Sequence, residues 1–136
     1  MDLLKDSCYV EIKPGKYTSK HWNKESIYFT DETFTYLTPA IIKHYKRYSL
    51  WGMSEINRQT WSQIIAELER IKLFLINNPK AENFKNQIGY LFETTQKNFT
   101  ENLHRNIKEL IKVITEFQSW IAEKLKRYEY VSILGI

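Results

Sequence analysis

Three histidines are the first candidates for acid–base or metal chemistry in this chain, and they lie far apart, at His21, His44 and His104. None has a second histidine at the spacing of a metal-binding motif. His44 and His104 fit solvent-facing positions on helices, and His21 falls in a polar loop. The single cysteine, Cys8, lies in a predicted strand, where it fits a small buried apolar residue better than a nucleophile.

Motifs for covalent or phosphate chemistry are missing from the sequence. It contains neither a Gly-x-Ser-x-Gly nucleophile motif nor a glycine-rich phosphate loop. The carboxylates Glu109, Glu116 and Glu123 recur every seven residues among Lys108, Lys112 and Lys126. This pattern is typical of a solvated ion-pair face on a helix, and it favours that over a carboxylate metal cage. We therefore predict a protein that is not an enzyme and that holds no metal ion or cofactor.

Basic and aromatic residues alternate between residues 43 and 51, and this gives the best indication of a binding surface. Arg, Tyr and Trp are frequent at protein-binding hot spots, and the same mixture can stack on single-stranded nucleic acid. A third interpretation is that the rings fill the core where one helix turns into the next. We place the centre of a partner-binding surface here, with one outlying residue from the preceding loop: Lys43, Tyr45, Lys46, Arg47, Tyr48, Trp51 and Trp22.

The composition is that of one ordinary globular domain, residues 1–136, with 43% hydrophobic and 26% charged residues. The net charge of +4 is spread along the chain rather than concentrated, unlike the charge of most nucleic-acid-binding domains. One cysteine permits no intramolecular disulfide and suits a reducing compartment. Neither a signal peptide nor an apolar run of membrane-spanning length is present, so we expect a cytoplasmic protein without a membrane partner.

Apolar residues at helical spacing predict most of the elements. A helix that begins at Thr30 or Asp31 should kink or restart at Pro39 and run to about Tyr48, before a turn over 49–52. Further helices are predicted from Ser54 or Asn57 to Asn77, over 82–96, and from about 98 to 127.

Alternating residues predict strands near both ends of the chain, over 7–13 and in the apolar tail 130–136, with a short extended piece at 26–29. The tail would expose a large apolar patch unless it pairs with the Tyr9–Ile12 segment. The expected fold is mostly α: a bundle of three to five helices, with a small β element formed by the N- and C-terminal segments.

Three segments together resemble a known family: the turn region Tyr45–Ile56, the helix Trp61–Leu68, and Trp120–Leu125 leading into Val131–Ile136. Covering roughly half the chain, they resemble small bacterial immunity proteins of polymorphic toxin systems, including contact-dependent growth inhibition. The resemblance implies a protein that neutralises a cognate toxin domain, often a nuclease, by tight binding. Immunity proteins against basic nucleases are often acidic, so the charge of +4 implies an acidic toxin surface or binding away from the nucleic-acid groove. The alternative is a nucleic-acid-binding accessory protein of a phage or mobile element; only under that alternative is nucleic acid the expected partner.

Overall fold

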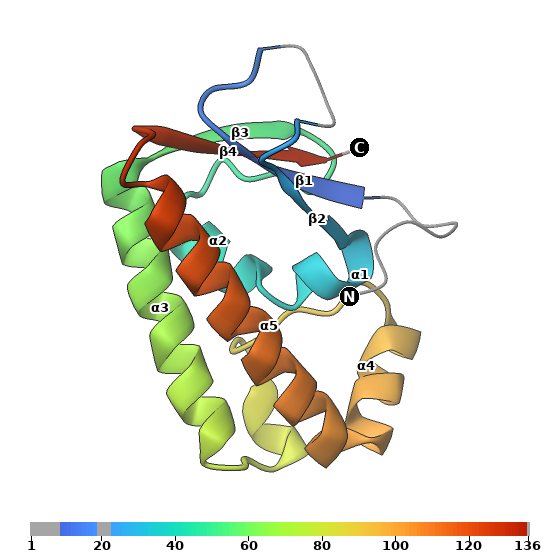
Figure 1. Cartoon of the computed structure of the whole chain (residues 1–136). Coiled ribbons are helices and arrows are strands. Elements are labelled where there is room, and N and C mark those ends of the chain that lie inside the picture. Colours follow the sequence, from blue (N-terminus) through green and yellow to red (C-terminus); the bar gives the residue numbers. More distant parts are fainter. Residues whose placement is uncertain (1–8, 19–22, 136) are drawn as a thin grey trace.

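The strands form one antiparallel sheet in the computed structural model, which describes residues 9–18 and 23–135 (Figure 1). They are β1 (Tyr9–Pro14), β2 (Ile27–Thr30), β3 (Met53–Asn57) and β4 (Tyr130–Gly135), in the order β2-β1-β4-β3. The predicted pairing of the two terminal segments is confirmed, because β4 lies beside β1 with Ile133 opposite Ile12. The sheet is larger than expected, so the mostly-α prediction is wrong: the described chain is a mixed fold of five α-helices and this four-stranded sheet.

Both faces of the sheet are covered. The helices pack on one face, where the inward side chains of β1, β3 and β4 join the hydrophobic core: Val10, Ile12, Ile56, Val131 and Ile133. The described parts of the 15–26 segment lie over the other face (Figure 1). On that face even polar residues are buried, including Glu11, Lys13 and Ser132. Glu11 accepts hydrogen bonds from the Ser26 hydroxyl (2.7 Å) and the Asn23 N–H (3.2 Å), which compensates for its burial.

Two short helices follow β2, as the sequence predicted. The Thr30 hydroxyl accepts a hydrogen bond from the Thr33 N–H and caps α1 (Asp31–Thr35). The chain restarts as α2 (Thr38–His44), with Pro39 in the first turn, where its missing N–H costs nothing. The helix ends at His44, earlier than the predicted Tyr48.

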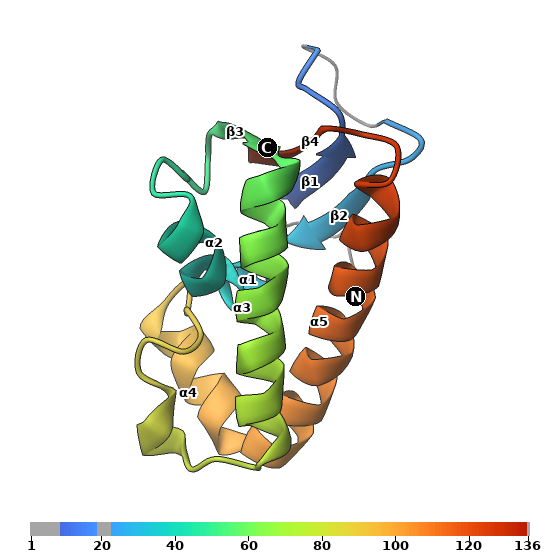
Figure 2. The same cartoon turned by 90° about the vertical axis from the view of Figure 1, so that its left-hand side faces the viewer.

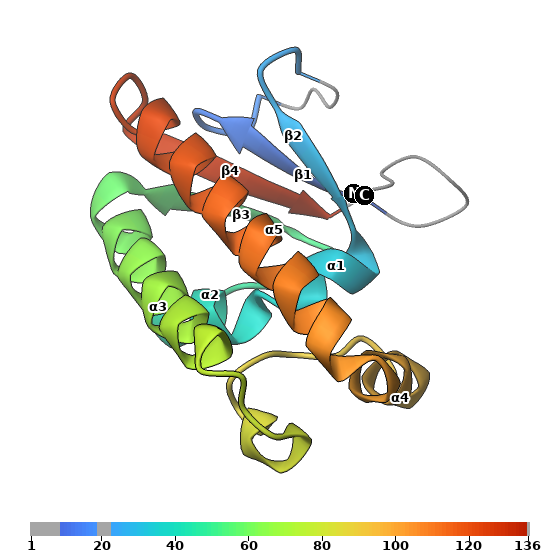
Figure 3. The same cartoon turned by 60° about the horizontal axis from the view of Figure 1, so that its bottom comes forward.

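The two long helices, α3 (Arg58–Ile76) and α5 (Leu103–Lys124), lie side by side beneath the sheet (Figures 2 and 3). Of the two predicted starts for α3, the later is right: the Asn57 side chain accepts the Thr60 N–H at 2.8 Å and caps the helix. Trp61 is fully buried in the first turn of α3, and its indole N–H donates to the Val131 carbonyl of β4 at 3.0 Å. This bond joins the helical layer to the centre of the sheet.

The predicted helix over 82–96 is wrong. A short 3-10 turn, η1 (Ala81–Phe84), leads into irregular chain, and α4 begins only later (Glu93–Glu101). Gly89 explains the difference, because its N–H donates to the Tyr36 carbonyl (3.3 Å) and a Cβ there would lie 2.6 Å from the Thr35 carbonyl oxygen. The irregular segment therefore packs its backbone directly against the junction between α1 and α2.

The long helix predicted over 98–127 is divided at Asn102, where α4 ends and α5 begins. The Asn106 side chain donates to the Phe99 carbonyl at 3.0 Å, which satisfies an unbonded carbonyl at the end of α4. The predicted apolar seam is nevertheless buried along α5 through Ile107, Leu110, Ile114, Phe117 and Ile121.

A polar cluster ties the end of α5 to the loop before β2. The Glu25 carboxylate accepts the Tyr128 hydroxyl at 2.6 Å and the Arg127 guanidinium at 2.8 Å, with the Lys124 ammonium at 3.6 Å. The hydrogen bond from Tyr128, followed by that from Arg127, lowers the pKa of Glu25 from 4.5 to about 2. Glu25 thus stays ionised well into the acid range and holds the covering loop in place.

Candidate functional site

The predicted partner-binding segment starts at the end of α2, and its first residue is engaged within the fold. The Lys43 ammonium lies 3.2 Å from the buried Glu67 carboxylate on α3. Arg70 binds the other carboxylate oxygen through two nitrogens, at 2.7 and 3.1 Å. The hydrogen bonds from Arg70 and then from Lys43 lower the pKa of Glu67. Lys43 therefore joins α2 to α3 and is not free to serve a partner without breaking this pair.

The two tyrosines of the segment pack against the core. Tyr45 and Tyr48 are half-buried, and the Tyr48 ring centroid lies 6.2 Å from that of Phe34. Burial raises the pKa of Tyr48, and its buried hydroxyl has no hydrogen-bond partner among the described residues. For these two rings the structure matches the core-filling interpretation.

Besides Lys43, three of the predicted residues are exposed: Lys46, Arg47 and Trp51. The Trp51 side chain is 56% exposed, and Met53, which the sequence analysis did not single out, is 50% exposed on the adjoining strand. Trp22 lies outside the described residues. We call Lys46, Arg47, Trp51 and Met53 the edge surface, because they lie on β3, an outer strand of the sheet, or in the connection from α2 to β3.

The free edge of β3 offers unpaired backbone groups beside these side chains. In an antiparallel pair, residues that exchange backbone hydrogen bonds alternate with residues that do not. The Gly135 N–H donates to the Gly52 carbonyl at 2.9 Å, which fixes the phase of the β3–β4 pair. The N–H and C=O groups of Met53 and Glu55 therefore point away from β4, and no described residue hydrogen-bonds to them. Such an edge is a ready template for another strand.

The end of β4 fixes where Trp51 lies. A Cβ at Gly135 would lie 2.7 Å from the Trp51 Cα and would contact the Leu50 carbonyl oxygen even more closely. The turn at 49–52 thus crosses directly over Gly135, and it is closed by a bond from the Gly52 N–H to the Ser49 carbonyl at 3.2 Å. Because backbone packs on backbone here, the exposed indole is held on a rigid support.

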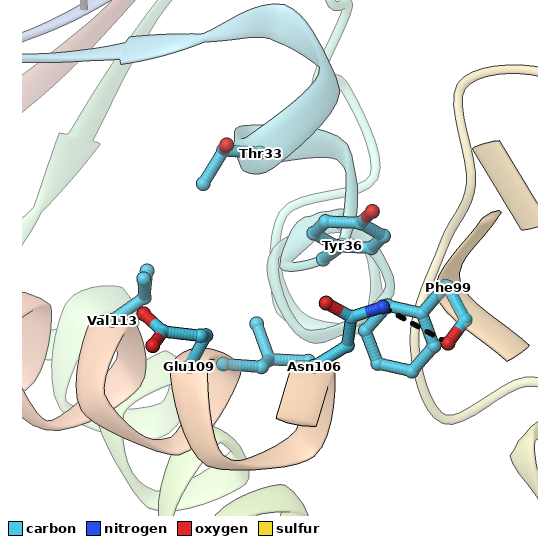
Figure 4. A pocket seen from close by; sticks show the side chains of 7 residues that line it. Thr33, Tyr36, Phe99, Asn106, Glu109 and Val113 are labelled. Carbon is cyan, nitrogen blue, oxygen red and sulfur yellow. Dashed lines mark hydrogen bonds between the residues drawn. The ribbon is translucent and has the colours of Figure 1, made fainter. Parts of the chain in front are cut away.

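A second surface feature lies between α5 and the β2–α1 segment. Two hollows of about 210 and 330 Å³ share Val113 in their walls. In the smaller one, Thr33 of α1 faces Glu109 and Val113 of α5, and Tyr36, directly after α1, lies near Asn106 and Phe99 (Figure 4). The larger is lined mainly by apolar side chains from β2 and α5: Ile27, Phe29, Phe117 and Trp120, with Glu116 as its one carboxylate. We call the two together the α5 groove.

The residues considered for acid–base or metal chemistry do not converge. His44 and His104 lie on different helices, and His21 and Cys8 fall outside the described residues. Glu109, Glu116 and Glu123 are exposed as predicted, although no ion pair joins them to the neighbouring lysines in the described structure. Within residues 9–18 and 23–135, no group of three or more His, Cys, Asp or Glu side chains is placed to hold a metal ion.

Two further observations concern the whole chain. None of the described helices has the length and apolar character needed to cross a membrane. Comparison of the chain with protein-family models, curated proteins and solved structures found no match.

Proposed function

We propose that this protein is an immunity protein that neutralises a cognate bacterial toxin by tight protein–protein binding. The observation that carries the proposal is the exposed pair Trp51 and Met53 beside the unpaired backbone of β3. Trp and Met are enriched in protein interfaces, and Trp is also enriched among hot-spot residues. The resemblance of this turn region to immunity proteins is the second ground for the proposal.

The free edge also suggests how a toxin would bind. The outward groups of Met53 and Glu55 lie about 7 Å apart along the strand, so a partner strand of four or five residues would satisfy them. Strand addition of this kind takes its affinity from backbone hydrogen bonds and its specificity from neighbouring side chains. Trp51 and Met53 would provide the apolar contacts, and Lys46 and Arg47 would favour an acidic toxin surface.

The test begins with the neighbouring genes. The gene immediately upstream should encode a large secreted toxin, whose C-terminal domain should co-purify with this protein and be neutralised by it in cells. Failure to bind that domain, or to protect cells that express it, would remove the proposal.

A matched pair of variants then locates the interface. Replacing Trp51 and Met53 by Ala should weaken the toxin complex at least 30-fold, since hot-spot truncations cost about 2 kcal/mol or more. Leu73 and Ile76 on α3 are equally exposed, at 53% and 56%, and their double Ala variant should bind within twofold of wild type. Equal losses in the two double variants, measured by calorimetry on folded proteins, would contradict this location.

One observation favours nucleic acid as a second candidate partner. Lys46 and Arg47 are exposed, form no ion pair with any described residue, and precede the exposed Trp51. A basic pair beside an aromatic ring can hold a phosphate and stack a base. Binding of a single-stranded oligonucleotide should then weaken steeply with salt and fail in Trp51→Ala. Weak or salt-independent binding would exclude this candidate.

A further inference from the structure

The α5 groove combines an apolar floor with two carboxylates of α5, in a protein whose net charge is positive. Leu110, Phe117 and Val113 of α5 line its hollows together with apolar residues of β2. Among the described residues that line it, the ionisable ones apart from tyrosine are Glu109 and Glu116. Neither carboxylate forms an ion pair with a described residue, so both are available to a cationic ligand.

Two further carboxylates are neighbours in sequence of a residue in the opposite wall. Asp31 and Glu32 form the first turn of α1, next to Thr33, which lines the groove. Neither Asp31 nor Glu32 forms an ion pair with a described residue. The carboxylates that line the groove, Glu109 and Glu116, both belong to α5, and they give it a local negative charge although the chain as a whole carries a charge of +4. The local negative charge favours a basic ligand, and the apolar floor favours a ligand that also has an apolar face.

The spacing along α5 indicates the form of that ligand. The groove runs from Asn106 to Trp120, which is about 21 Å at 1.5 Å per residue. Glu109 and Glu116 are separated by about 10.5 Å along the helix axis. Residues seven apart on a ligand helix have the same separation and share one face, whereas same-face residues of a strand lie about 7 or 13 Å apart.

We propose that the α5 groove binds an amphipathic helix of about 15 residues from another protein. The apolar face of that helix fills the two hollows, and Lys or Arg residues seven positions apart on its flank pair with Glu109 and Glu116. This site is separate from the edge surface, so the proposal does not depend on the immunity function.

A synthetic probe tests the proposal directly. The probe is a fluorescein-labelled 15-residue peptide of Leu, Lys and Ala, with Leu at helical spacing on one face and two Lys residues seven apart beside it. The control peptide carries Glu in place of Lys. By fluorescence anisotropy the Lys peptide should bind saturably, and the Glu peptide should not bind at the same concentrations. Failure of the Lys peptide to bind, or equal binding of both, would overturn the proposal.

Variants on α5 separate specific binding from general attraction. The double change Glu109→Gln and Glu116→Gln should weaken the Lys peptide at least tenfold, about 1.4 kcal/mol. Glu123→Gln removes the next carboxylate of the same stripe, outside the groove, and should change affinity less than twofold. The double Ala variant at Trp51 and Met53 should also bind normally, whatever becomes of the toxin test. If Glu123→Gln weakened binding of the Lys peptide as much as the double Gln variant does, the proposal would be overturned.

Val113→Arg provides a second, independent block. Val113 is half-buried where the two hollows meet, so the new guanidinium would fill the channel between the two carboxylates. The Val113→Arg variant should not bind the Lys peptide, and its far-UV circular dichroism should match that of wild type. If Val113→Arg unfolds the protein, the double Gln variant remains the test of the proposal. A wild-type dimer in sedimentation velocity that Val113→Arg dissociates would assign the groove to a second copy of the chain and overturn the proposal.

Discussion

Replacing Trp61 by Phe should destabilise the protein far more than the same replacement at Trp51. Trp61 of α3 is fully buried; its indole donates to β4, and its ring makes a T-shaped contact with Phe117 of α5, with the centroids 6.0 Å apart. Trp51 is 56% exposed. The two variants make the same chemical change, so any difference in the free energy of unfolding reports the environment alone.

Three effects contribute to the expected loss in the free energy of unfolding of Trp61→Phe. Loss of the hydrogen bond from the indole N–H to the Val131 carbonyl costs about 1 kcal/mol. The Val131 carbonyl still accepts a hydrogen bond in the variant, because Val131 and Ile56 form a hydrogen-bonded pair of the β3–β4 ladder. The smaller ring buries about 40 Å² less apolar surface, worth about 1 kcal/mol. A residual cavity of about 40 Å³ costs about 1 kcal/mol more.

Trp61→Phe should therefore lower the free energy of unfolding by about 3 kcal/mol, and Trp51→Phe by less than about 0.5 kcal/mol. For 136 residues the larger loss corresponds to a fall in Tm of roughly 10 °C. Urea unfolding followed by circular dichroism at 222 nm measures both. A loss below about 1 kcal/mol at Trp61, or equal losses at the two positions, would refute the assignment of Trp61 to the junction of sheet and helices.

Three further predictions concern other contacts. Tyr48→Phe should leave stability unchanged or raise it slightly, because it removes a buried hydroxyl without a partner; a loss above about 1 kcal/mol in urea unfolding would contradict this. Gly135→Ala should cost about 1–3 kcal/mol and weaken toxin binding because backbone crosses that position, whereas Gly52→Ala, whose Cβ meets its nearest neighbour at 3.3 Å, should be mild. Glu25 has a folded pKa of about 2 against its ordinary 4.5, so it stabilises the fold fully above about pH 4.5 and loses this effect as the pH falls towards 2. The stability difference between wild type and Glu25→Gln should shrink from pH 5 to pH 2.5, and a constant difference would show that Glu25 and Tyr128 are not coupled in this way.

Local patterns in the sequence identified the elements that depend on one surface or one residue. The seam of α5 and the stripe of α3 were visible because each helix buries a single face. Pro39 marked the restart of α2 because proline fixes the start of a helix. The pairing of β1 with β4 followed from the need to cover an apolar tail.

The elements that were missed depend on neighbours distant in sequence. The inward positions of β3 are Ser54 and Ile56, so only one of them is apolar, and the strand runs directly into the cap of α3. Gly89 looked like a weak point in a helix, yet its role is to admit the backbone of α1, which no local pattern reveals.

The candidate site was predicted only in part for the same reason. Composition marked residues 43–51 as aromatic and basic, but it could not show that Tyr48 turns towards Phe34 while Trp51 turns outwards. Nor could it show that Glu67 engages Lys43 across two helices. Met53 joins the surface only through the missed strand. The α5 groove arises where β2 and α1 meet α5, segments about 80 residues apart, and no sequence window contains both.

The strand order β2-β1-β4-β3 also governs when this protein can fold during its synthesis. β4, residues 130–135, lies between β1 and β3, and it leaves the ribosome after every other described element. Until then β1 and β3 have no strand to join them, and their apolar faces remain open. The pair of β1 and β2 can form earlier, but the four-stranded sheet is complete only after translation has passed β4, through β1–β4 contacts between segments more than 100 residues apart, which form slowly. Nascent chains that lack β4 should accordingly be substrates for chaperones and proteases.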